Sequence, residues 1–456
     1  MQRERKIARW AAERIKEAGG RAFFVGGCVR DQYTGYECKD LDIEIYGISQ
    51  EQLLEILQRL GPVDLVGKSF GVYKVAGVDV DFAFPRRERK NGEGHRAFQI
   101  RPDPFMDPKE ACSRRDFTIN AMMQDVLTGE VLDYYGGRKD LEEKRICHIR
   151  PASFQEDSLR VFRAAQFSAR FQFAIAPQTL ELCRQIPVND LPGERVEGEL
   201  KKVLLKAEKP SLFFQSLRQM DHLHEWFPEI SHLVGVEQRP DAHPEGDVYT
   251  HTLMVLDQAA LLRDKAHHPY DLMLAACTHD LGKAATTQLR NGKIQSLGHE
   301  QAGIPLAQAM LSRLKVAGDI QKRVLNWTEN HMRPGAMALS SSRESRTNLF
   351  LDRVEDPSDL LLLAQADCKG RGLPVAFEKE QQFWRERMQV YSNIVKDNPF
   401  PTGKELLALG VPPGKHMGAL LQQARNQILC GDRREIALRN AVRVYDRMKK
   451  ESKEDE

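Results

Sequence analysis

The chain has 456 residues and a mass of 52.0 kDa, enough for two to four folded domains at ~100–200 residues each. Hydrophobic residues make up 41% of it and charged residues 29%, with a mean hydropathy of −0.50, which excludes a disordered polyelectrolyte. The 67 Lys and Arg residues nearly balance the 65 Asp and Glu residues, so a preference for nucleic acid must come from local charge.

The eight cysteines are scattered and form no C-x-x-C pair, which argues against a zinc ribbon and for a reducing compartment. No stretch reaches the ~20 apolar residues of a membrane span, and the N-terminus lacks the apolar region of a signal peptide. We therefore expect a cytoplasmic protein with no membrane contact.

The first 150 residues mix short helices and strands. Gly19 and Gly20 end a predicted helix over 4–18, and Gly26 and Gly27 separate the next predicted strand from a helix that Gly35 ends. Predicted strands cover 22–25, 40–45, 72–75 and 78–84, and a further helix covers 50–60. This mixture is typical of α+β or α/β proteins.

From about Ser153 onward the apolar spacing is almost wholly helical. Ten of the 13 histidines lie between His222 and His331, which suggests a domain with its own chemistry. Breaks rich in Pro and Gly then predict four domains, covering 1–150, 151–240, 241–375 and 376–456.

Two alternating carboxylates stand out in the first domain. Asp40 and Asp42 point to the same side of a predicted strand, and such a pair suits Mg²⁺ or Mn²⁺. A third acid, Asp79 or Asp81, would complete a two-metal site. Upstream, the Gly26-Gly27 turn opens a helix whose free N–H groups favour phosphate, and Arg30 adds a charged donor.

Gly26-Gly27, Arg30-Asp31 and Asp40-Leu41-Asp42, in this order and spacing, resemble the polymerase-β-type nucleotidyltransferases. Within these the chain is similar to the class II branch of CCA-adding enzymes and poly(A) polymerases. Further motifs of that branch follow at Arg86–Arg89, Arg114–Ala121, Glu156–Arg163 and Glu194–Leu200. The resemblance implies an α+β fold with a mixed or antiparallel sheet in the head, then a helical neck and a helical tail that contacts tRNA.

The resemblance also implies roles for individual residues. Asp40, Asp42 and Asp81 would be the catalytic Mg²⁺ ligands, with Asp81 preferred to Asp79 for its spacing to Arg86. Nucleotide binding would involve glycine backbone, arginines and polar residues of three motifs, namely Gly26, Gly27, Arg30, Arg115, Asp116, Asn120, Asp157, Arg160 and Arg163. Gln166 stands where many members have a third arginine.

Asp157 and Arg160, three residues apart, could select the base. A carboxylate accepts from an exocyclic amine and a guanidinium donates to a ring acceptor, an order that CTP and ATP offer and UTP and GTP do not. The stretch Arg86–Arg101, with six Lys or Arg residues and two Glu, predicts a loop near RNA or triphosphate, and its presence favours an enzyme that can add A.

The histidine-rich region holds a second constellation. His251, His279-Asp280 and Asp367, in this order, resemble the HD phosphohydrolase superfamily, and such ligands suit a transition metal such as Ni²⁺ or Mn²⁺. In that superfamily His299 and His331 would supply a second metal or phosphate contact, and Lys283 could offset substrate charge.

Together the motifs resemble the bacterial multifunctional CCA-adding enzymes with an HD domain. That resemblance implies addition of C and A to the tRNA 3′ end from CTP and ATP, with 2′,3′-cyclic phosphodiesterase, 2′-nucleotidase and phosphatase activities. A relative limited to A, CC or poly(A) addition carries the same motifs. A tRNA-binding chaperone or hydrolase with a dead transferase site is the alternative from another class.

Overall fold

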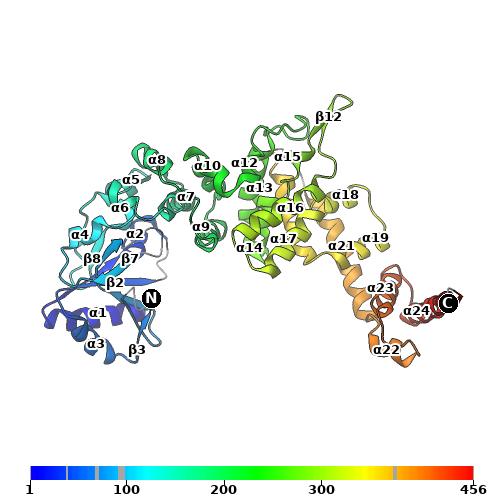
Figure 1. The fold of residues 1–456 in the computed structure, drawn as a ribbon, viewed down its shortest axis with the longest axis horizontal. Coiled ribbons are helices and arrows are strands. Elements are labelled where there is room, and N and C mark those ends of the chain that lie inside the picture. The colour runs from blue at the N-terminus through cyan, green and yellow to red at the C-terminus, as the bar shows by residue number, and fades with distance from the viewer. Residues whose placement is uncertain (1, 37–39, 67–70, 91–97, 373–376, 455–456) are drawn as a thin grey trace. The chain divides into compact units, whose positions relative to one another are not determined.

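The computed structural model describes residues 2–36, 40–66, 71–90, 98–372 and 377–454 (Figure 1). The chain divides into two compact units, Met1–Pro228 and Glu229–Glu456. No helix within the described ranges is long and apolar enough to cross a membrane. Each unit carries one of the two predicted constellations.

A seven-stranded mixed sheet forms the centre of the first unit, in the order β3-β4-β5-β2-β1-β8-β9. Its pairs are antiparallel except β2 and β5, which run parallel. The strands are β1 (Arg21–Val25), β2 (Leu41–Tyr46), β3 (Val63–Val66), β4 (Val72–Val75), β5 (Val80–Ala83), β8 (Met123–Asp125) and β9 (Val131–Leu132). The helices around them are α1 (Gln2–Glu17), α2 (Gly27–Thr34), α3 (Gln50–Gln58), α4 (Pro108–Ser113), η1 (Thr118–Asn120) and α5 (Gly137–Glu142). The predicted α+β class is confirmed.

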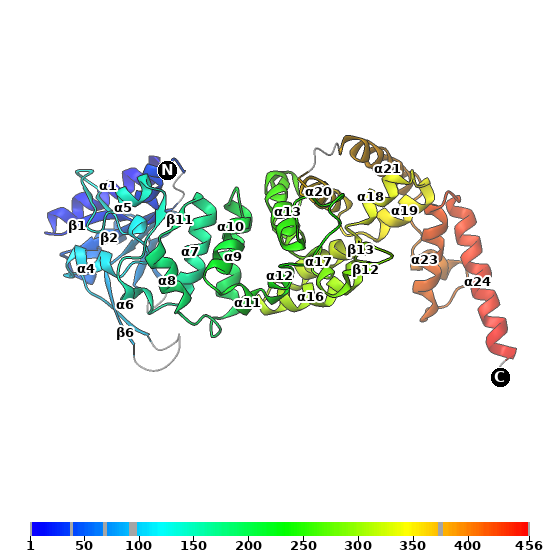
Figure 2. The same cartoon turned by 90° about the horizontal axis from the view of Figure 1, so that it is seen from above.

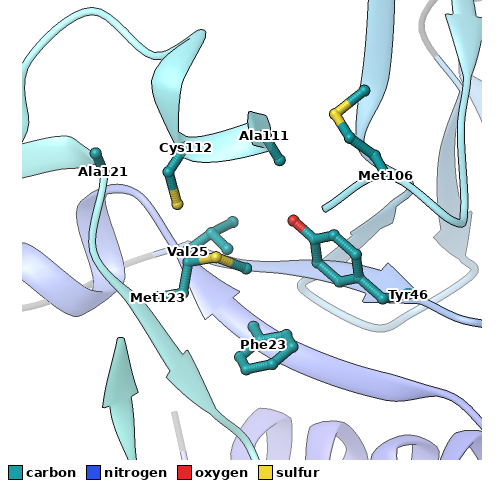
Figure 3. Close-up of a cluster of buried hydrophobic side chains, with 8 residues drawn as sticks. All are labelled: Phe23, Val25, Tyr46, Met106, Ala111, Cys112, Ala121 and Met123. Carbon is teal, nitrogen blue, oxygen red and sulfur yellow. The ribbon is translucent and has the colours of Figure 1, made fainter. Parts of the chain in front are cut away.

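An apolar cluster packs α4 and the residues just before it against β1 and β2 (Figure 3). Phe23 and Val25 of β1 and Tyr46 of β2 meet Met106 and Cys112, from the segment that enters α4. The rings of Phe23 and Tyr46 meet edge to face at 5.6 Å. This cluster holds the Arg114–Ala121 motif against the strand that carries the two alternating carboxylates.

The rest of the first unit is helical. Its helices are α6 (Pro151–Phe154), α7 (Leu159–Phe171), α8 (Pro177–Arg184), α9 (Gly193–Lys206), α10 (Ser211–Gln219) and α11 (Leu223–Trp226). Two short strands, β10 (Arg145–Ile146) and β11 (Ala174–Ile175), pair in parallel beside them.

The second unit is helical except for a short hairpin of β12 (Gln288–Arg290) and β13 (Lys293–Gln295), which the sequence pattern does not predict (Figure 2). Its first helices are α12 (Pro228–Ser231), α13 (Val248–Leu262), η2 (Arg263–Lys265), α14 (Pro269–Thr278), α15 (Lys283–Thr286) and α16 (His299–Arg313). They are followed by α17 (Gly318–Asn330), α18 (Arg333–Leu339), α19 (Glu344–Arg353), α20 (Pro357–Lys369) and α21 (Glu378–Asp397). The last are α22 (Gly403–Ala408), α23 (His416–Leu429) and α24 (Arg434–Glu454), which share an apolar core of their own.

Both ends of the basic stretch that was predicted as a loop are strands. β6 (Arg86–Lys90) pairs antiparallel with β7 (Phe98–Pro102), with Arg86 opposite Pro102 and Arg87 opposite Arg101. Residues 91–97 lie outside the described part of the chain. Backbone hydrogen bonding holds such a ladder, so a charged sequence without apolar alternation can form it.

Candidate functional sites

The alternating carboxylates of the first unit lie where two parallel strands run side by side. Asp42 of β2 is directly opposite Asp81 of β5 in the strand register, and Asp40 immediately precedes β2. Desolvation and the nearby charge of Asp81 raise the pKa of Asp42 to about 6. A divalent cation would relieve this crowding of like charges, and carboxylate oxygens suit Mg²⁺. The three carboxyl groups are not, however, among the described groups whose ligand atoms all lie within 4.8 Å of one another.

A lysine forms an ion pair with one of these three carboxylates. Lys74 of β4 lies opposite Asp81 in the register, and its Nζ is 2.9 Å from Asp81 Oδ1. The sequence motifs did not point to Lys74, because the contact arises from pairing between strands.

Asp40 and Asp42 border a cavity of about 750 Å³ in the first unit, whereas Asp81 is not among its lining residues. It is lined by Asp40, Asp42 and every predicted nucleotide-binding residue, that is, Gly26, Gly27, Arg30, Arg115, Asp116, Asn120, Asp157, Arg160 and Arg163. Further cations on its wall are Arg86, Arg114, Arg170, Arg195, Lys202 and Lys206. A space of this size with so many cations suits a nucleoside triphosphate.

The Gly-Gly turn brings the backbone close to this cavity. Gly26 has φ 67, which favours glycine, and α2 begins at the next residue. A Cβ at Gly26 would lie 3.5 Å from Nη1 of Arg115, and one at Gly27 would lie 3.4 Å from Nη2 of Arg30. The absence of side chains leaves the helix N-terminus open to an anion between these guanidinium groups.

Four predicted residues form one continuous network. Arg30 donates to Asn120 Oδ1 at 2.6 Å, Asn120 Nδ2 donates to Asp116 Oδ1 at 3.0 Å, and Arg163 Nε donates to Asp116 Oδ2 at 2.7 Å. Burial opposes ionisation of Asp116, but Arg163 holds the pKa of that carboxyl below its usual range. This geometry gives Asp116 and Asn120 the role of holding the two arginines in place.

Arg115 is held by a residue that sequence reasoning missed. Its Nη2 lies 3.1 Å from Glu44 Oε2, and Tyr46 donates to the same oxygen at 2.9 Å. Glu44 continues the alternation of Asp40 and Asp42 along β2 and lines the cavity, so the period of two could have identified it.

The predicted base-selecting pair lies at the start of α7. Asp157 precedes the helix, and its Oδ1 accepts from the Leu159 backbone N–H at 3.1 Å. Its Oδ2 accepts from Arg195 of α9 at 3.0 Å. Arg160 donates to the Arg114 carbonyl at 2.9 Å and to the Ser153 carbonyl. These contacts fix both side chains at the cavity wall.

Gln166, the departure from the family pattern, also lines the cavity. Its side chain is 1% exposed, and Nε2 has no hydrogen-bond partner among the residues that the structure describes. A buried amide donor without a partner is costly, so this position favours a polar group of the ligand.

The second constellation converges from five helices and the turns that flank them. His251 lies on α13, His279 caps α14, His299 opens α16, His331 caps α17 and Asp367 lies on α20. α14 ends at Thr278, so His279 and Asp280 lie in the turn that follows the helix. Gly282 permits this turn, because a Cβ there would meet the His299 carbonyl oxygen at 2.0 Å.

These side chains form two separate groups with metal-ligand spacing. His251, His279 and Asp367 form one group, and Asp280, His299 and His331 form the other. Asp280 links them, with Oδ2 3.3 Å from His279 Nε2 and Oδ1 3.3 Å from His299 Nε2. The cluster therefore brings together every residue predicted for this site.

The histidine rings are oriented by their second nitrogens. Nδ1 of His279, His299 and His331 lies 3.0, 2.8 and 2.8 Å from backbone carbonyl oxygens, which directs Nε2 inward as an acceptor. His279 Nε2 is buried and makes no well-aligned hydrogen bond within the described ranges. Imidazole acceptors with carboxylates fit a borderline transition metal such as Ni²⁺ or Mn²⁺.

Lys283 binds one of the carboxylates of the cluster. Its Nζ lies 2.7 Å from Asp280 Oδ2 and donates to Gln238 Oε1 at 2.9 Å. Burial opposes ionisation of Asp280, but Lys283 and then His279 hold its pKa well below the usual range. Lys283 thus stabilises the Asp280 carboxylate. The sequence had suggested only that it could offset substrate charge.

Glu245 is a further residue that sequence reasoning missed. Its Oε1 lies 2.8 Å from Nδ1 of His251 and 2.8 Å from Nδ1 of His243. His251 Nε2 lies 3.1 Å from Asp367 Oδ1, so His251 is held between two carboxylates. No spacing rule links Glu245 to the other residues, because the loop before α13 places it.

Replacing Glu245 with Ala is expected to weaken Ni²⁺ or Mn²⁺ binding by about 10–100-fold, because His251 loses the partner that orients its ring. Calorimetric titration of metal-free protein measures this. Glu237→Ala removes an exposed carboxyl from the same loop and is expected to leave the affinity unchanged. Equal affinities for the two variants would contradict an orienting role.

Metal binding at this cluster is expected to strengthen as pH rises. Burial opposes protonation of His251, yet its hydrogen bonds to Asp367 and Glu245 raise its pKa to about 9. The ring must lose that proton before Nε2 can bind a metal, so affinity should rise about tenfold per pH unit below 9. Titrations at three pH values between 6 and 8.5 test this, and a flat profile would refute it.

Two family models match this chain, one in each unit. A family model described as Poly A polymerase head domain matches residues 22–147, and the HD domain model matches residues 248–369. The first range contains the motifs from Gly26 to Ala121 and the second contains His251 to Asp367, whereas the motifs Glu156–Arg163 and Glu194–Leu200 lie outside both.

Curated relatives span most of the chain. A multifunctional CCA protein of Actinobacillus pleuropneumoniae serotype 5b is 37% identical over 384 residues, covering 82% of this chain and 90% of the relative. Those of Xanthomonas campestris pv. campestris and Acinetobacter baumannii are 38% and 36% identical, covering 76% and 83% of this chain and 85% and 91% of the relatives.

Solved structures share the fold at lower identity. One apo form of a CCA-adding enzyme has a TM-score of 0.64 at 20% identity, covering 96% of this chain and 95% of that one. The Thermotoga maritima CCA-adding enzyme complexed with tRNA has a TM-score of 0.59 at 20% identity, with the same coverage.

Proposed function

The chain belongs to the family of multifunctional CCA proteins, as its motifs predicted, and from this we propose that it adds C, C and A to tRNA 3′ ends from CTP and ATP without a nucleic-acid template. The observation that carries the proposal is the cavity of the first unit, whose wall includes both the alternating carboxylates and the pair Asp157 and Arg160. A single nucleotide can therefore meet the reacting and the selecting groups.

The chain's own residues divide the work of transfer. Asp40, Asp42 and Asp81 would hold Mg²⁺, which neutralises phosphate charge and acidifies the attacking 3′-hydroxyl when bound. The N-terminus of α2 and Arg115 bind the triphosphate, while Glu44 keeps the Arg115 guanidinium in place. Asp116 and Asn120 hold Arg163 and Arg30 in fixed positions. Preorganised charges of this kind do not have to reorient during reaction.

Base selection follows from the chemistry of two fixed side chains. Asp157 accepts from the exocyclic amine that cytosine and adenine share, and Arg160 donates to the neighbouring ring acceptor. Carbonyl contacts hold Arg160 at the cavity wall, and Arg195 holds Asp157. A uracil or guanine would present the wrong order of donor and acceptor and leave these groups unpaired.

Arg195→Ala is expected to lower the preference for CTP over UTP by about tenfold or more, because Asp157 loses the donor that fixes its carboxylate. The ratio of kcat/KM values for CTP and UTP measures this. Arg184→Ala removes an exposed guanidinium that pairs with Glu181 on α8 and serves as the matched control. An unchanged ratio for Arg195→Ala would refute the positioning of Asp157 by Arg195.

For the second unit we propose metal-dependent hydrolysis of phosphate esters, of the 2′,3′-cyclic phosphodiester and phosphomonoester types. His251, His279, Asp280 and Asp367 would hold the metal, which supplies Lewis acidity toward a phosphate ester. His299 and His331 stand across Asp280 and would hold a second ion or a phosphate oxygen. Lys283 keeps Asp280 ionised and so preserves the charge that links the two groups.

One set of reactions separates full CCA addition from its narrower relatives. Purified protein is incubated with tRNA ending at the discriminator base, at C or at CC, with each nucleoside triphosphate alone. We expect CMP on the first two ends and AMP on the third. Addition that stops after CC, addition only to a CC end, or repeated AMP addition would assign the chain to one of those relatives.

A further inference from the structure

A second pocket, of about 420 Å³, lies in the second unit outside the metal-ligand cluster. It is formed by α18 and α19 together with the end of α17, and Figures 1 and 2 both show α18 and α19 beside α21. Its wall consists of Asn330, Arg333, Ala336, Met337, Ser340, Arg346, Leu349, Phe350 and Arg353. We name it the arginine pocket, after its three guanidinium groups.

The floor of the arginine pocket is apolar and firmly built. Trp384 of α21 is fully buried, and its Nε1 donates to the Pro334 carbonyl on α18 at 3.1 Å. Its ring lies 5.6 Å from that of Phe350 on α19. Trp384 thus contacts both α18 and α19. Met337 and Phe350 form the floor of the pocket, which suits a flat or apolar group.

The rim of the arginine pocket carries positive charge without nearby compensation. Arg333, Arg346 and Arg353 are exposed, and none of them has an ion pair within the described ranges. The nearby carboxylates are engaged elsewhere: Glu344 with Arg387 at 2.9 Å, Asp352 with Arg425 at 2.6 Å and Glu355 with Lys322 at 2.5 Å. Guanidinium groups left unpaired around a concave surface attract an anion.

The spacing of the guanidinium groups favours an extended anion. Arg346 and Arg353 are seven residues apart on α19, so their Cα atoms are separated by about 10 Å along the helix. A chain of phosphodiesters can meet both with neighbouring phosphates more readily than one phosphate can, and an apolar floor accepts a sugar or base between them.

We propose that the arginine pocket binds the sugar-phosphate backbone of an RNA strand. The proposal rests on the proposed function, which makes tRNA a substrate of the chain. It assigns to the HD-containing unit its own RNA contact. Arg333, Arg346 and Arg353 bind phosphates, and the surface over Met337 and Phe350 receives the intervening sugar or base.

Chemical protection tests the RNA contact directly. Phenylglyoxal modifies accessible arginines, and peptide mass spectrometry measures the extent at each site in the full chain. We expect micromolar tRNA to reduce modification of all three arginines at least severalfold, with ATP and inorganic phosphate at the same concentration having no effect. Equal protection by ATP or phosphate would mean a site for small anions, and no protection would mean no anion site. Either result overturns the proposal.

Variants give a second readout of the arginine pocket. Replacing all three arginines with Ala should reduce the slope of log affinity for tRNA against log salt concentration by about two to three, since three phosphate contacts are lost. The triple Lys variant keeps the charges and should keep the slope, which controls for folding, and Lys265→Ala removes an exposed charge elsewhere in the unit. A slope unchanged in the Ala variant overturns the proposal. Neither readout requires catalysis, so a failure of CCA addition is distinguishable from a failure of this contact.

Discussion

The Asp42→Asn variant is expected to lose nucleotide addition to tRNA, with a rate at least about 10³-fold below that of the unchanged chain. Asp42 stands between Asp40 and the facing Asp81, so its removal takes away the central member of the proposed Mg²⁺ ligand set. Extension of radiolabelled tRNA in single-turnover conditions measures the rate. Hydrolysis of a phosphate ester by the second unit is expected to continue, because its ligands lie in the other compact unit.

The stability of this variant provides its control. The pKa of Asp42 is raised from 3.8 to about 6 by burial and by Asp81, so the folded protein binds more protons than the unfolded chain between these values. Stability of the metal-free protein therefore falls as pH rises through that window, and Asn removes the penalty. We expect Asp42→Asn to melt no lower than the unchanged chain at pH 7 and to lose the stabilisation by Mg²⁺.

Retention of nucleotide addition by Asp42→Asn would refute the assigned ligand set. If tRNA binding and hydrolysis were the only activities of the unchanged chain, and if the variant preserved both, the chain would instead be a tRNA-binding chaperone or hydrolase. These outcomes differ from simple misfolding, because the melting curve measures the folded state independently.

The Asp280→Asn variant is expected to lose transition-metal binding and phosphate-ester hydrolysis while still adding nucleotides. Asp280 is 2% exposed and bridges the two ligand groups, so no other carboxylate can replace it there. Metal content by mass spectrometry and hydrolysis of a 2′,3′-cyclic nucleotide measure the loss. Lys283 loses its carboxylate partner at 2.7 Å, so a lower melting temperature of the variant is also expected.

Asp264→Asn is the matched control, since it removes an exposed carboxyl from the same unit. It should keep both the metal and the hydrolase activity. Hydrolysis that persists in Asp280→Asn at full rate, or that persists after chelation of metal from the unchanged chain, would contradict the proposed role of this cluster.

Much of the fold follows from local sequence patterns. The helix ending near Gly19, the strand before Gly26 and the alternating strand through Asp42 all formed close to the predicted ranges. β3 and the β6 and β7 ladder were not predicted, because their residues are charged or too few to show alternation. The hairpin of β12 and β13 is similarly short and polar.

The motif residues of the two sites could be predicted from the sequence. The residues that only contact and position them could not. The order of the histidines and aspartates predicted His251, Asp280 and Asp367 as metal ligands, and the fold brings them into one cluster. Glu245 and Lys74 act through contacts made by loop geometry and strand pairing, which no spacing along the chain encodes. Asp157 lies ahead of its helix, and its carboxylate accepts from the Leu159 backbone N–H.

The most direct test of CCA addition is the sequence of the product made from tRNA that lacks its 3′ end, with CTP and ATP present together. The proposed function predicts three added nucleotides in the order C, C, A, followed by arrest, and no addition from UTP or GTP. An unextended tRNA, or a homopolymer of A, would contradict the proposal that one cavity selects both bases and transfers both nucleotides.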